Sequence, residues 1–563
     1  MTIQEIRQQL KKWQVEAYVV SHGNRFIGQD VLPEEHKLKA LCGFGGSAGI
    51  AVITADEAFL LVDGRYELQA RLETKAEEIT VVDEMPRFKS VCDLLRQKNI
   101  TSVGYDAWCH SVAEMEFLKR RYRELRFVDV DEFMAADEKK KVTAMPRDVK
   151  FAGQSRAEKL ALVTEVIAEQ HADAFLFTSA DSVSWLLNLY ARDLPCTPIV
   201  RAYALVEADG KVTLFADNLE ADLPVKNWRQ FAELMAQTGG RKIMFDAHTA
   251  PEKIKTLAAE DTVLYKAPDM CALLKVEKNA VELQGMINCH IRDGVALVKL
   301  LAWLDANRHG LHELDVVERL HELRAEQEYF FSESFETIAG SGADGAIVHY
   351  QPTTKTNAEL KDGSLLLLDS GGQYFDGTTD VTRTIALGKP SAAMIADFTM
   401  VLKAHIALAQ MRFPCGTPGM KLDIIARTPI WHELQDYKHG TGHGVACFGN
   451  VHEGPISISV GGSDYGFKPN MVTSNEPGIY KEGQYGIRIE NLQYTVTSPQ
   501  NADFLEFRYL TKVPIDKTLI DKYLLSEGEQ AWLNKYHEDV YNSLAPYLNE
   551  NEKVWLKNAC SPL

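Results

Sequence analysis

The stretch from Gly363 to Leu387 reads GSLLLLDSGGQYFDGTTDVTRTIAL and predicts two paired strands. Its four leucines are typical of a buried strand, the Gly-Gly pair of a turn, and the β-branched residues beyond it of a returning strand. Asp369 ends the apolar run, and Asp380 lies eleven residues later in the returning strand. Two carboxylates on buried strands are costly unless a cation neutralises them. Because carboxylate oxygens bind and bridge hard divalent cations, the stretch predicts a metal site.

Two later stretches offer further metal ligands. The first reads HGTGHG from His439 and is followed by VHEGP from Val451. The second includes Glu476 in the word NEPG and Glu490 in the word IRIEN. Both glutamates lie beside runs with strand-like composition. The candidate ligands therefore come in the order Asp369, Asp380, His443, Glu476 and Glu490.

This order, with the words around each member, resembles the metallopeptidase family of methionine aminopeptidase, prolidase and aminopeptidase P, which is named for its pita-bread fold. Within that family the chain is most similar to the long, three-domain form of aminopeptidase P. The resemblance extends along nearly the whole chain. It includes GFGGSAG at Gly43, VDGRY at Val62, DSVSWLLNL at Asp181 and WLNKYH at Trp532.

The resemblance implies a mixed α+β protein of three domains. Two related α/β domains of the creatinase N-terminal type are expected at 1–145 and 146–275. A pita-bread catalytic domain with a C-terminal extension is expected at 276–563. For this last domain the residues alone predict only an α+β class.

Two features of the N-terminal half bear on its role. The strand words at Ala17 (AYVVS) and Ala58 (AFLLVD) recur at Ala174 (AFLFT) and Lys211 (KVTLFAD), which favours an ancient duplication. The glycine word at Gly43 precedes a predicted strand, whereas a dinucleotide-binding loop requires a helix there, so no cofactor-binding residues are predicted. We interpret both domains as scaffold, wall of the substrate channel or dimer surface.

By the same resemblance, Asp369 chelates one metal ion, Asp380 and Glu490 bridge two ions, and His443 and Glu476 complete the second position. Four carboxylates balance two divalent cations and leave room for a bridging hydroxide. An oxygen-rich set with one imidazole suits manganese, which is the expected ion, while cobalt and zinc stay open. Glu476 is also the expected proton shuttle between the attacking water and the leaving nitrogen.

Residues outside the ligand set complete the predicted site. The resemblance implies that His349 and His452 donate hydrogen bonds to substrate carbonyls and to the developing oxyanion. His439 either shares that role or supports a ligand. Arg488 is expected to form a supporting ion pair, and Tyr480 is expected to lie beside the ligands.

The implied activity is that of an Xaa-Pro aminopeptidase, which removes the first residue of a peptide whose second residue is proline. The scissile bond is a tertiary amide whose nitrogen has no hydrogen and whose ring fixes φ. A prolidase would share all five ligands but cleave only dipeptides, and such enzymes usually have a single N-terminal domain. A creatinase-like enzyme departs from the ligand set. A peptide-binding member without catalysis would have lost ligands, and this sequence keeps them.

Composition excludes several other classes of protein. A formal net charge of −18 argues against nucleic-acid partners and anionic membrane surfaces. The sequence has no run of 18 or more apolar residues, so no membrane span is predicted. The N-terminal segment lacks an apolar signal core, and nine cysteines without C-x-x-C spacing indicate free thiols, so a cytoplasmic protein is expected.

The C-terminal segment carries Trp532, Tyr536 and Trp555 and resembles the extension on which family members dimerise. A homodimer formed through the catalytic domain is therefore expected. The same aromatic side chains could equally pack on their own domain.

Overall fold

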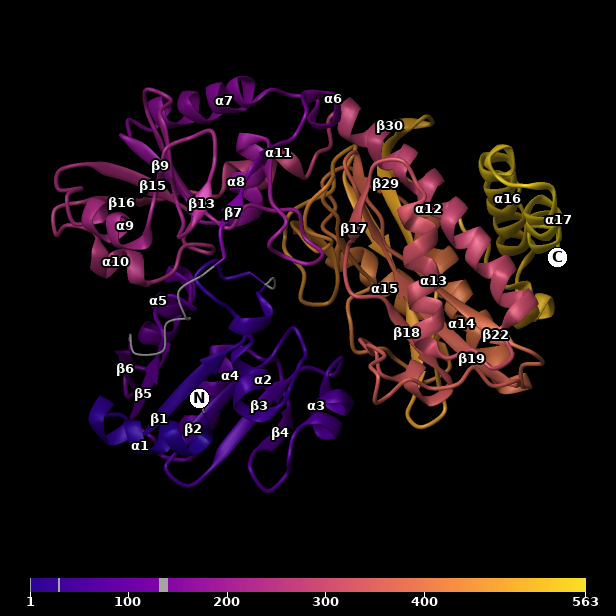
Figure 1. Ribbon diagram of the computed structural model, residues 1–563, viewed down its shortest axis with the longest axis horizontal. Helices are drawn as coiled ribbons and strands as arrows, with labels where there is room; N and C mark the ends of the chain where they lie inside the picture. The colour runs from indigo at the N-terminus through magenta and orange to yellow at the C-terminus, as the bar shows by residue number, and fades with distance from the viewer. Residues whose placement is uncertain (1, 29–30, 131–139) are drawn as a thin grey trace. The chain divides into compact units, whose positions relative to one another are not determined.

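The computed structural model describes residues 2–28, 31–130 and 140–563 (Figure 1). The chain divides into two compact units. The first unit comprises Met1–Val149, Gln154–Leu194 and Ile199–Cys271, and the second comprises Lys150–Gly153, Pro195–Pro198 and Ala272–Leu563. Both N-terminal sheets belong to the first unit, and the predicted metal ligands belong to the second.

The first N-terminal sheet has six strands in the order β4-β3-β2-β1-β5-β6. These are β1 (Ala17–Ser21), β2 (Ile50–Thr54), β3 (Ala58–Val62), β4 (Thr80–Asp83), β5 (Ser102–Tyr105) and β6 (Arg126–Asp129). β1 pairs with β2 antiparallel and with β5 parallel. The chain thus extends the sheet outward to β4 and then returns to the other side of β1.

Helices cover both faces of this sheet. They are α1 (Ile3–Trp13), α2 (Lys37–Cys42), α3 (Glu67–Glu73), α4 (Phe88–Gln97) and α5 (Val112–Arg121). Tyr18 and Val20 of β1 pack in one apolar cluster with α1, whereas Ala17 and Val19 pack in another with α4. Because successive side chains point to opposite faces, a strand covered on both sides needs the continuous apolar run that is found here.

The second N-terminal sheet repeats the first. Its order is β14-β12-β11-β9-β15-β16. These strands are β9 (Ala174–Phe177), β11 (Tyr203–Glu207), β12 (Val212–Phe215), β14 (Val225–Lys226), β15 (Lys242–Phe245) and β16 (Val263–Lys266). Its central strand β9 pairs antiparallel with β11 and parallel with β15, as β1 does with β2 and β5. The order and directions agree strand for strand, which supports the predicted duplication.

The second compact unit combines antiparallel strands with long helices (Figure 1). Its main sheet has the order β23-β30-β29-β26-β24-β25, and a smaller sheet has the order β18-β19-β22. The strands are β18 (Ile338–Ser341), β19 (Ser364–Ser370), β22 (Val381–Leu387), β23 (Arg412–Pro414), β24 (Gly442–Gly444), β25 (Glu453–Ile458), β26 (Val472–Asn475), β29 (Asn491–Ser498) and β30 (Asn501–Tyr509). The short pair β27 (Gly478–Lys481) and β28 (Tyr485–Arg488) lies between β26 and β29 in the sequence.

The four-leucine run forms β19 and is buried on both of its faces. Leu366 and Leu368 pack in a cluster with residues of α12 (Ala280–Asn307) and α13 (Glu313–Ala325). Leu365 packs in a different cluster, with residues of α14 (Ala392–Ala409). The predicted buried strand is therefore present, and two layers of helix account for its lack of polar alternation.

Among the residues that the structure describes, α14 is the helix long and apolar enough to cross a membrane, with a mean hydropathy of 1.5. Half of it is buried inside the protein. Phe398, Val401 and Leu402 pack in the core, and Asp397 accepts a hydrogen bond from the Tyr485 hydroxyl. These are the contacts of a core helix.

The C-terminal aromatic residues pack on their own domain, which was one of the two interpretations of the sequence. They belong to α16 (Glu527–Leu544) and α17 (Glu550–Ala559). Trp532 stacks on Tyr536 with ring centroids 5.4 Å apart, and the Tyr536 hydroxyl accepts a hydrogen bond of 2.8 Å from Arg383. The Trp555 indole donates to Asp305 at 3.2 Å. These contacts account for the aromatic residues without a partner chain.

Candidate metal centre

The β19–β22 pair carries the first two predicted ligands. Asp369 lies in β19 opposite Thr382, and Asp380 comes one residue before β22 begins. The segment between the strands is more than the predicted turn, because it forms the short strands β20 (Gly372–Tyr374) and β21 (Gly377–Thr378). A Cβ on Gly371 would lie 2.0 Å from the Thr379 carbonyl oxygen, so only glycine allows this close approach.

The other predicted ligands lie on or beside the strands of the main sheet. His443 is the central residue of β24, Glu476 follows β26, and Glu490 immediately precedes β29. A Cβ on either neighbour of His443, Gly442 or Gly444, would lie 2.1 Å from a backbone oxygen of an adjacent strand. The glycines around His443 thus permit β24 to pass close between its neighbours, and this packing sets the position of the imidazole.

The structure brings these side chains into one buried cluster. Ligand atoms of Asp380, His443 and Glu490 all lie within 4.8 Å of one another. His443 Nε2 is 3.5 Å from Asp380 Oδ2 and 3.5 Å from Glu476 Oε1. Asp369 belongs to the same electrostatic cluster, because Asp380 and Asp369 each help to raise the pKa of Glu490. Five residues from distant parts of the chain therefore converge.

Arg488 links Asp369 to the outer part of the site. Its Nη2 donates to Asp369 Oδ2 at 2.6 Å, its Nη1 donates to the Tyr480 hydroxyl at 2.6 Å, and its Nε donates to Thr382 Oγ1 at 3.1 Å. The supporting ion pair expected from the sequence is thus with Asp369, and Tyr480 is next to it. Asp369 Oδ1 is buried without a hydrogen-bond partner among the described residues.

The cluster holds more negative charge than its protein surroundings neutralise. Burial raises the pKa of Asp369 to about 6, where Arg488 opposes the shift and Asp380 adds to it. Burial likewise raises the pKa of Glu476 to about 7 and that of Glu490 well above its usual range. Although burial acts against it, contact with Asp380 and Glu476 raises the pKa of His443 to about 9. All four shifts favour retained protons, so added positive charge stabilises the buried cluster.

Divalent cations fit this donor set. Carboxylate oxygens and one imidazole are ligands that manganese, cobalt and zinc accept, and carboxylates can bridge two such ions. The unpartnered Asp369 Oδ1 is a ready donor, since a buried carboxylate oxygen without a partner is costly. Bound cations would also offset the burial and the mutual repulsion that raise the pKa values of these carboxyl groups.

The metal-free protein should lose thermal stability as the pH rises from about 5.5 to about 9. The folded form keeps protons on Asp369 and Glu476 up to pH values of about 6 and about 7, whereas the unfolded form releases them lower, so raising the pH favours unfolding. His443 acts in the same direction, because its proton stabilises the folded form until the pH passes about 9. A divalent cation at one hundred times its Kd should restore about 2.7 kcal/mol at neutral pH.

Thermal denaturation of chelator-treated protein, followed with and without manganese at several pH values, measures this effect. The Asp380→Asn variant should gain less from manganese than the wild type. A melting temperature that rises with pH in metal-free protein, or that manganese leaves unchanged, would contradict the excess of negative charge inferred for the buried cluster.

The predicted outer histidines lie at different depths. His439 is 7% exposed, and its Nε2 is 2.8 Å from the Tyr480 hydroxyl while its Nδ1 is 3.9 Å from Glu476 Oε2. His452 is exposed, and its ring centroid is 4.3 Å from that of His443. Both histidines therefore border the ligand cluster directly.

His349 is connected to the ligand cluster by Val348, the residue before it in the chain. It is half-buried and follows a short 3-10 helix, and the carbonyl of Val348 accepts a hydrogen bond of 3.3 Å from Arg488. Glu313, which is fully buried in the first turn of α13, holds the same segment. It accepts hydrogen bonds from the Ser341 amide at 2.7 Å and from the Tyr350 hydroxyl at 2.8 Å.

Two supporting residues were not anticipated from the sequence. Thr382 donates a hydrogen bond of 2.8 Å to Glu490 Oε2. Its position opposite Asp369 in the strand pair is the feature that could have indicated this role. Arg324 is fully buried, pairs with Asp293 at 2.8 Å, and donates to Ser370 Oγ at 3.1 Å, next to Asp369. Its sequence context on a helix carries no comparable signal.

Comparison with known families and proteins agrees with this geometry. The family described as "Metallopeptidase family M24" matches residues 284–497, and its C-terminal region matches residues 503–563. Two families described as "Creatinase/Prolidase N-terminal domain" match residues 3–137 and 135–282. A probable Xaa-Pro aminopeptidase P of Laccaria bicolor is 35% identical over 99% of this chain and 93% of its own length. The chain belongs to metallopeptidase family M24.

Other similar proteins extend the comparison. Aminopeptidase P2 of Arabidopsis thaliana is 35% identical over 98% of this chain and 86% of its own length. The crystal structure of X-prolyl aminopeptidase from Caenorhabditis elegans, described as a cytosolic enzyme with a di-nuclear active site, has a TM-score of 0.92, 30% identity and full coverage of both chains. A prolidase of Thermococcus sibiricus at 22% identity, with a TM-score of 0.52, covers 65% of this M24 chain and shares its fold only.

These matches confirm the predicted family and fold class. The M24 chain has two creatinase-type α/β domains followed by a pita-bread catalytic domain, and its class is metallo-aminopeptidase.

Proposed function

We propose that this protein hydrolyses the bond between the first residue and proline at the start of peptides, using two manganese ions. The observation that carries the proposal is the buried cluster of Asp380, His443 and Glu490, with Asp369 and Glu476 around it. The similarity of this protein to Xaa-Pro aminopeptidases over nearly the whole chain supports the same substrate class.

In this proposal Asp369 would hold one ion, His443 and Glu476 would hold the other, and Asp380 and Glu490 would contribute to both. When bound, the two cations lower the pKa of a water molecule and polarise the scissile carbonyl. Manganese is favoured because the donor set is rich in carboxylate oxygen, and cobalt or zinc would bind the same side chains.

Glu476 is the proposed proton carrier. Its carboxylate lies between His443 at 3.5 Å and His439 at 3.9 Å, and burial raises its pKa to about 7. A carboxyl group with a pKa near neutral pH can accept a proton from water and then donate it. The acceptor is the departing proline nitrogen, which must be protonated to leave as an amine. His349, His439 and His452 are the proposed donors to substrate carbonyl oxygens.

Further features of the proposal concern the protein as a whole. We take the domains to run over 1–145, 146–275 and 276–563. We also propose a cytoplasmic homodimer formed through the catalytic domain. Light scattering tests the oligomeric state, and a monomer mass would remove this part of the proposal without affecting the rest.

The metal-stripped protein should regain cleavage of an Xaa-Pro-Xaa tripeptide when manganese is added, releasing the first residue as a free amino acid. Product analysis by chromatography measures the cleavage, with an Xaa-Pro dipeptide and an Xaa-Ala-Xaa tripeptide as comparison substrates. Cleavage of the dipeptide alone would indicate a prolidase. If neither proline peptide is cleaved while manganese is bound, the proposal is wrong and a peptide-binding role gains support.

A further inference from the structure

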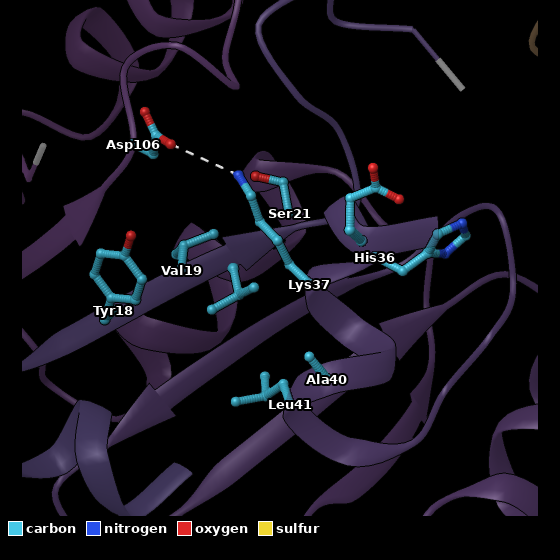
Figure 2. A pocket seen from close by; sticks show the side chains of 10 residues that line it. Tyr18, Val19, Ser21, His36, Lys37, Ala40, Leu41 and Asp106 are labelled. Carbon is cyan, nitrogen blue, oxygen red and sulfur yellow. Dashed lines mark ion pairs between the residues drawn. The ribbon is translucent and has the colours of Figure 1, made fainter. Parts of the chain in front are cut away.

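The N-terminal domain contains a pocket of about 180 Å³ that the proposed peptidase reaction does not use (Figure 2). It lies at the carboxyl ends of β1 and β5, since Ser21 ends β1 and Asp106 follows β5. The chain leaves β1 toward β2 on one side and later returns to β5 on the other. In open α/β sheets, ligands bind at such a reversal of strand order, outside the carboxyl ends of the strands.

Three side chains at this position form a chain of hydrogen bonds. Ser21 Oγ is 2.9 Å from His110 Nε2, and His110 Nδ1 is 3.0 Å from Glu114 Oε2. Ser21 lines the pocket, whereas His110 is only 3% exposed behind it. A hydroxyl within reach of an imidazole that a carboxylate orients is the arrangement by which enzymes activate serine. The arrangement is recognised by geometry, because its members occur in different orders along different chains.

The imidazole of His110 is held in one orientation. Its ring contacts Phe88 and Tyr105, with ring centroids 4.7 Å and 5.8 Å away. Glu114 lies three residues after Ser111, the N-cap of α5. A glutamate at this position commonly accepts a hydrogen bond from the backbone amide of the N-cap residue. Here the Glu114 carboxylate faces His110 Nδ1 instead. The helix terminus thus directs this acid to the histidine.

The hydrogen-bond partners determine where the protons lie. Although burial opposes it, the hydrogen bond with His110 lowers the pKa of Glu114, so this group is a carboxylate at neutral pH and accepts a hydrogen bond. A carboxylate can only accept, so His110 Nδ1 is the donor to Glu114, and in the neutral imidazole Nε2 is then the acceptor. Nε2 then accepts the hydroxyl proton of Ser21, which leaves the lone pairs of Ser21 Oγ available for attack.

The remaining wall of the pocket offers apolar surface and one cation, beside the carboxylates of Glu34 and Asp106. Leu41 and Ala40 supply apolar surface, and Lys37 supplies a cation (Figure 2). Lys37 Nζ is 3.6 Å from Asp106 Oδ2 and 2.9 Å from Cys109 Sγ. A cation on the wall stabilises the oxyanion that forms when a carbonyl carbon is attacked. Burial raises the pKa of Cys109 to about 12, so its thiol does not compete as a nucleophile.

We propose that Ser21, His110 and Glu114 form a second active site, independent of metal, that hydrolyses esters of short acyl groups. Ser21 Oγ bonds to the acyl carbon while its proton passes to His110 Nε2. The bond between the acyl carbon and the alcohol oxygen then breaks, and the alcohol leaves with that proton. Water next attacks the acyl carbon, gives a proton to His110, and releases the carboxylic acid as the proton returns to Ser21. Glu114 is a positioning residue, which acts through His110.

A fluorophosphonate probe, which reacts with activated serines, tests the proposal on the full-length protein. We expect labelling at Ser21, located by peptide mass spectrometry, and a loss of at least about tenfold in labelling rate in His110→Gln and Glu114→Gln. Ser47→Ala is the matched control, since Ser47 is an exposed serine of the same domain whose hydroxyl contacts Tyr66 instead of a histidine. It should label at the wild-type rate.

The aminopeptidase site and this site are separable. Asp380→Asn should keep the labelling, and Ser21→Ala should abolish labelling and p-nitrophenyl acetate hydrolysis while keeping metal-dependent peptide cleavage. Thermal denaturation confirms that each variant is folded. Absence of labelling at Ser21 in folded wild-type protein, or an equal rate in His110→Gln, would show that Ser21 only holds the histidine and would overturn the proposal.

Discussion

Replacing Asp380 with asparagine should lower kcat/KM for an Xaa-Pro-Xaa peptide on the order of a thousandfold. Asp380 Oδ2 is 3.5 Å from His443 Nε2, and its carboxylate belongs to the group within 4.8 Å that includes Glu490. In the proposed site this residue would help to hold both cations, and the amide removes the one negative charge that it would share between them. Metal ions supply several kcal/mol of transition-state stabilisation, and each 1.36 kcal/mol is a factor of ten in rate.

Two measurements distinguish loss of metal from loss of fold. Metal analysis after dialysis should show fewer manganese ions bound to Asp380→Asn than to the wild type. Asp376→Asn is the matched control, because Asp376 is a buried carboxylate of the segment between β19 and β22, where it pairs with Arg292. It should retain its manganese and most of its activity. An Asp380→Asn variant with wild-type activity would remove Asp380 from the site and with it the proposed arrangement of ligands.

The fold was predictable where a short stretch of sequence carries its own structural signal. The leucines of β19 are apolar without alternation because α12 and α13 cover one face and α14 the other. The repeated strand words of the N-terminal half correspond to β1 and β9, and to β3 and β12, at equivalent positions of two sheets with the same order. In both cases the pattern depends on which faces of a single strand are buried. The spacing of apolar residues in the sequence indicates this directly.

Contacts between distant residues were not predictable in the same way. Arg488 was expected to form an ion pair, but its partner Asp369 is 119 residues away. Ser21 and His110 are separated by 89 residues, and neither lies in a recognisable catalytic motif. The strands β20 and β21 were missed because the Gly-Gly pair by itself indicates a turn. Such features depend on how strands pair across the fold, which local composition does not encode.

Replacing Arg488 with methionine should destabilise the metal-free catalytic unit by about 3–5 kcal/mol, the usual cost of leaving a buried charge without its partner. Arg488 is 1% exposed, and Asp369, whose carboxylate it contacts at 2.6 Å, is 8% exposed. Methionine fills much of the volume but offers no hydrogen-bond donor to Asp369, Tyr480 or Thr382. Urea denaturation measures the loss of unfolding free energy. The unfolding transition of the catalytic unit is recognised as the one that manganese shifts.

The matched control is Arg412→Met, because Arg412 pairs with Glu506 at 3.2 Å on an exposed surface and should contribute less than about 1 kcal/mol. If both variants unfold at the same urea concentration, Asp369 does not depend on Arg488 for its charge balance. Removing both charges, in Arg488→Met with Asp369→Asn, should cost less than the sum of the two single changes by about 1–3 kcal/mol.

Manganese should recover more stability in Arg488→Met than in the wild type. With the guanidinium absent, the charge of Asp369 is left to bound cations, so the free energy gained on binding metal is larger. Activity should still fall in the metal-loaded variant, since Arg488 also holds the Tyr480 hydroxyl, which is 2.8 Å from His439 Nε2. A variant that regains stability with manganese but not activity would separate the two tasks of this arginine: it neutralises the buried carboxylate, and it positions the outer histidine.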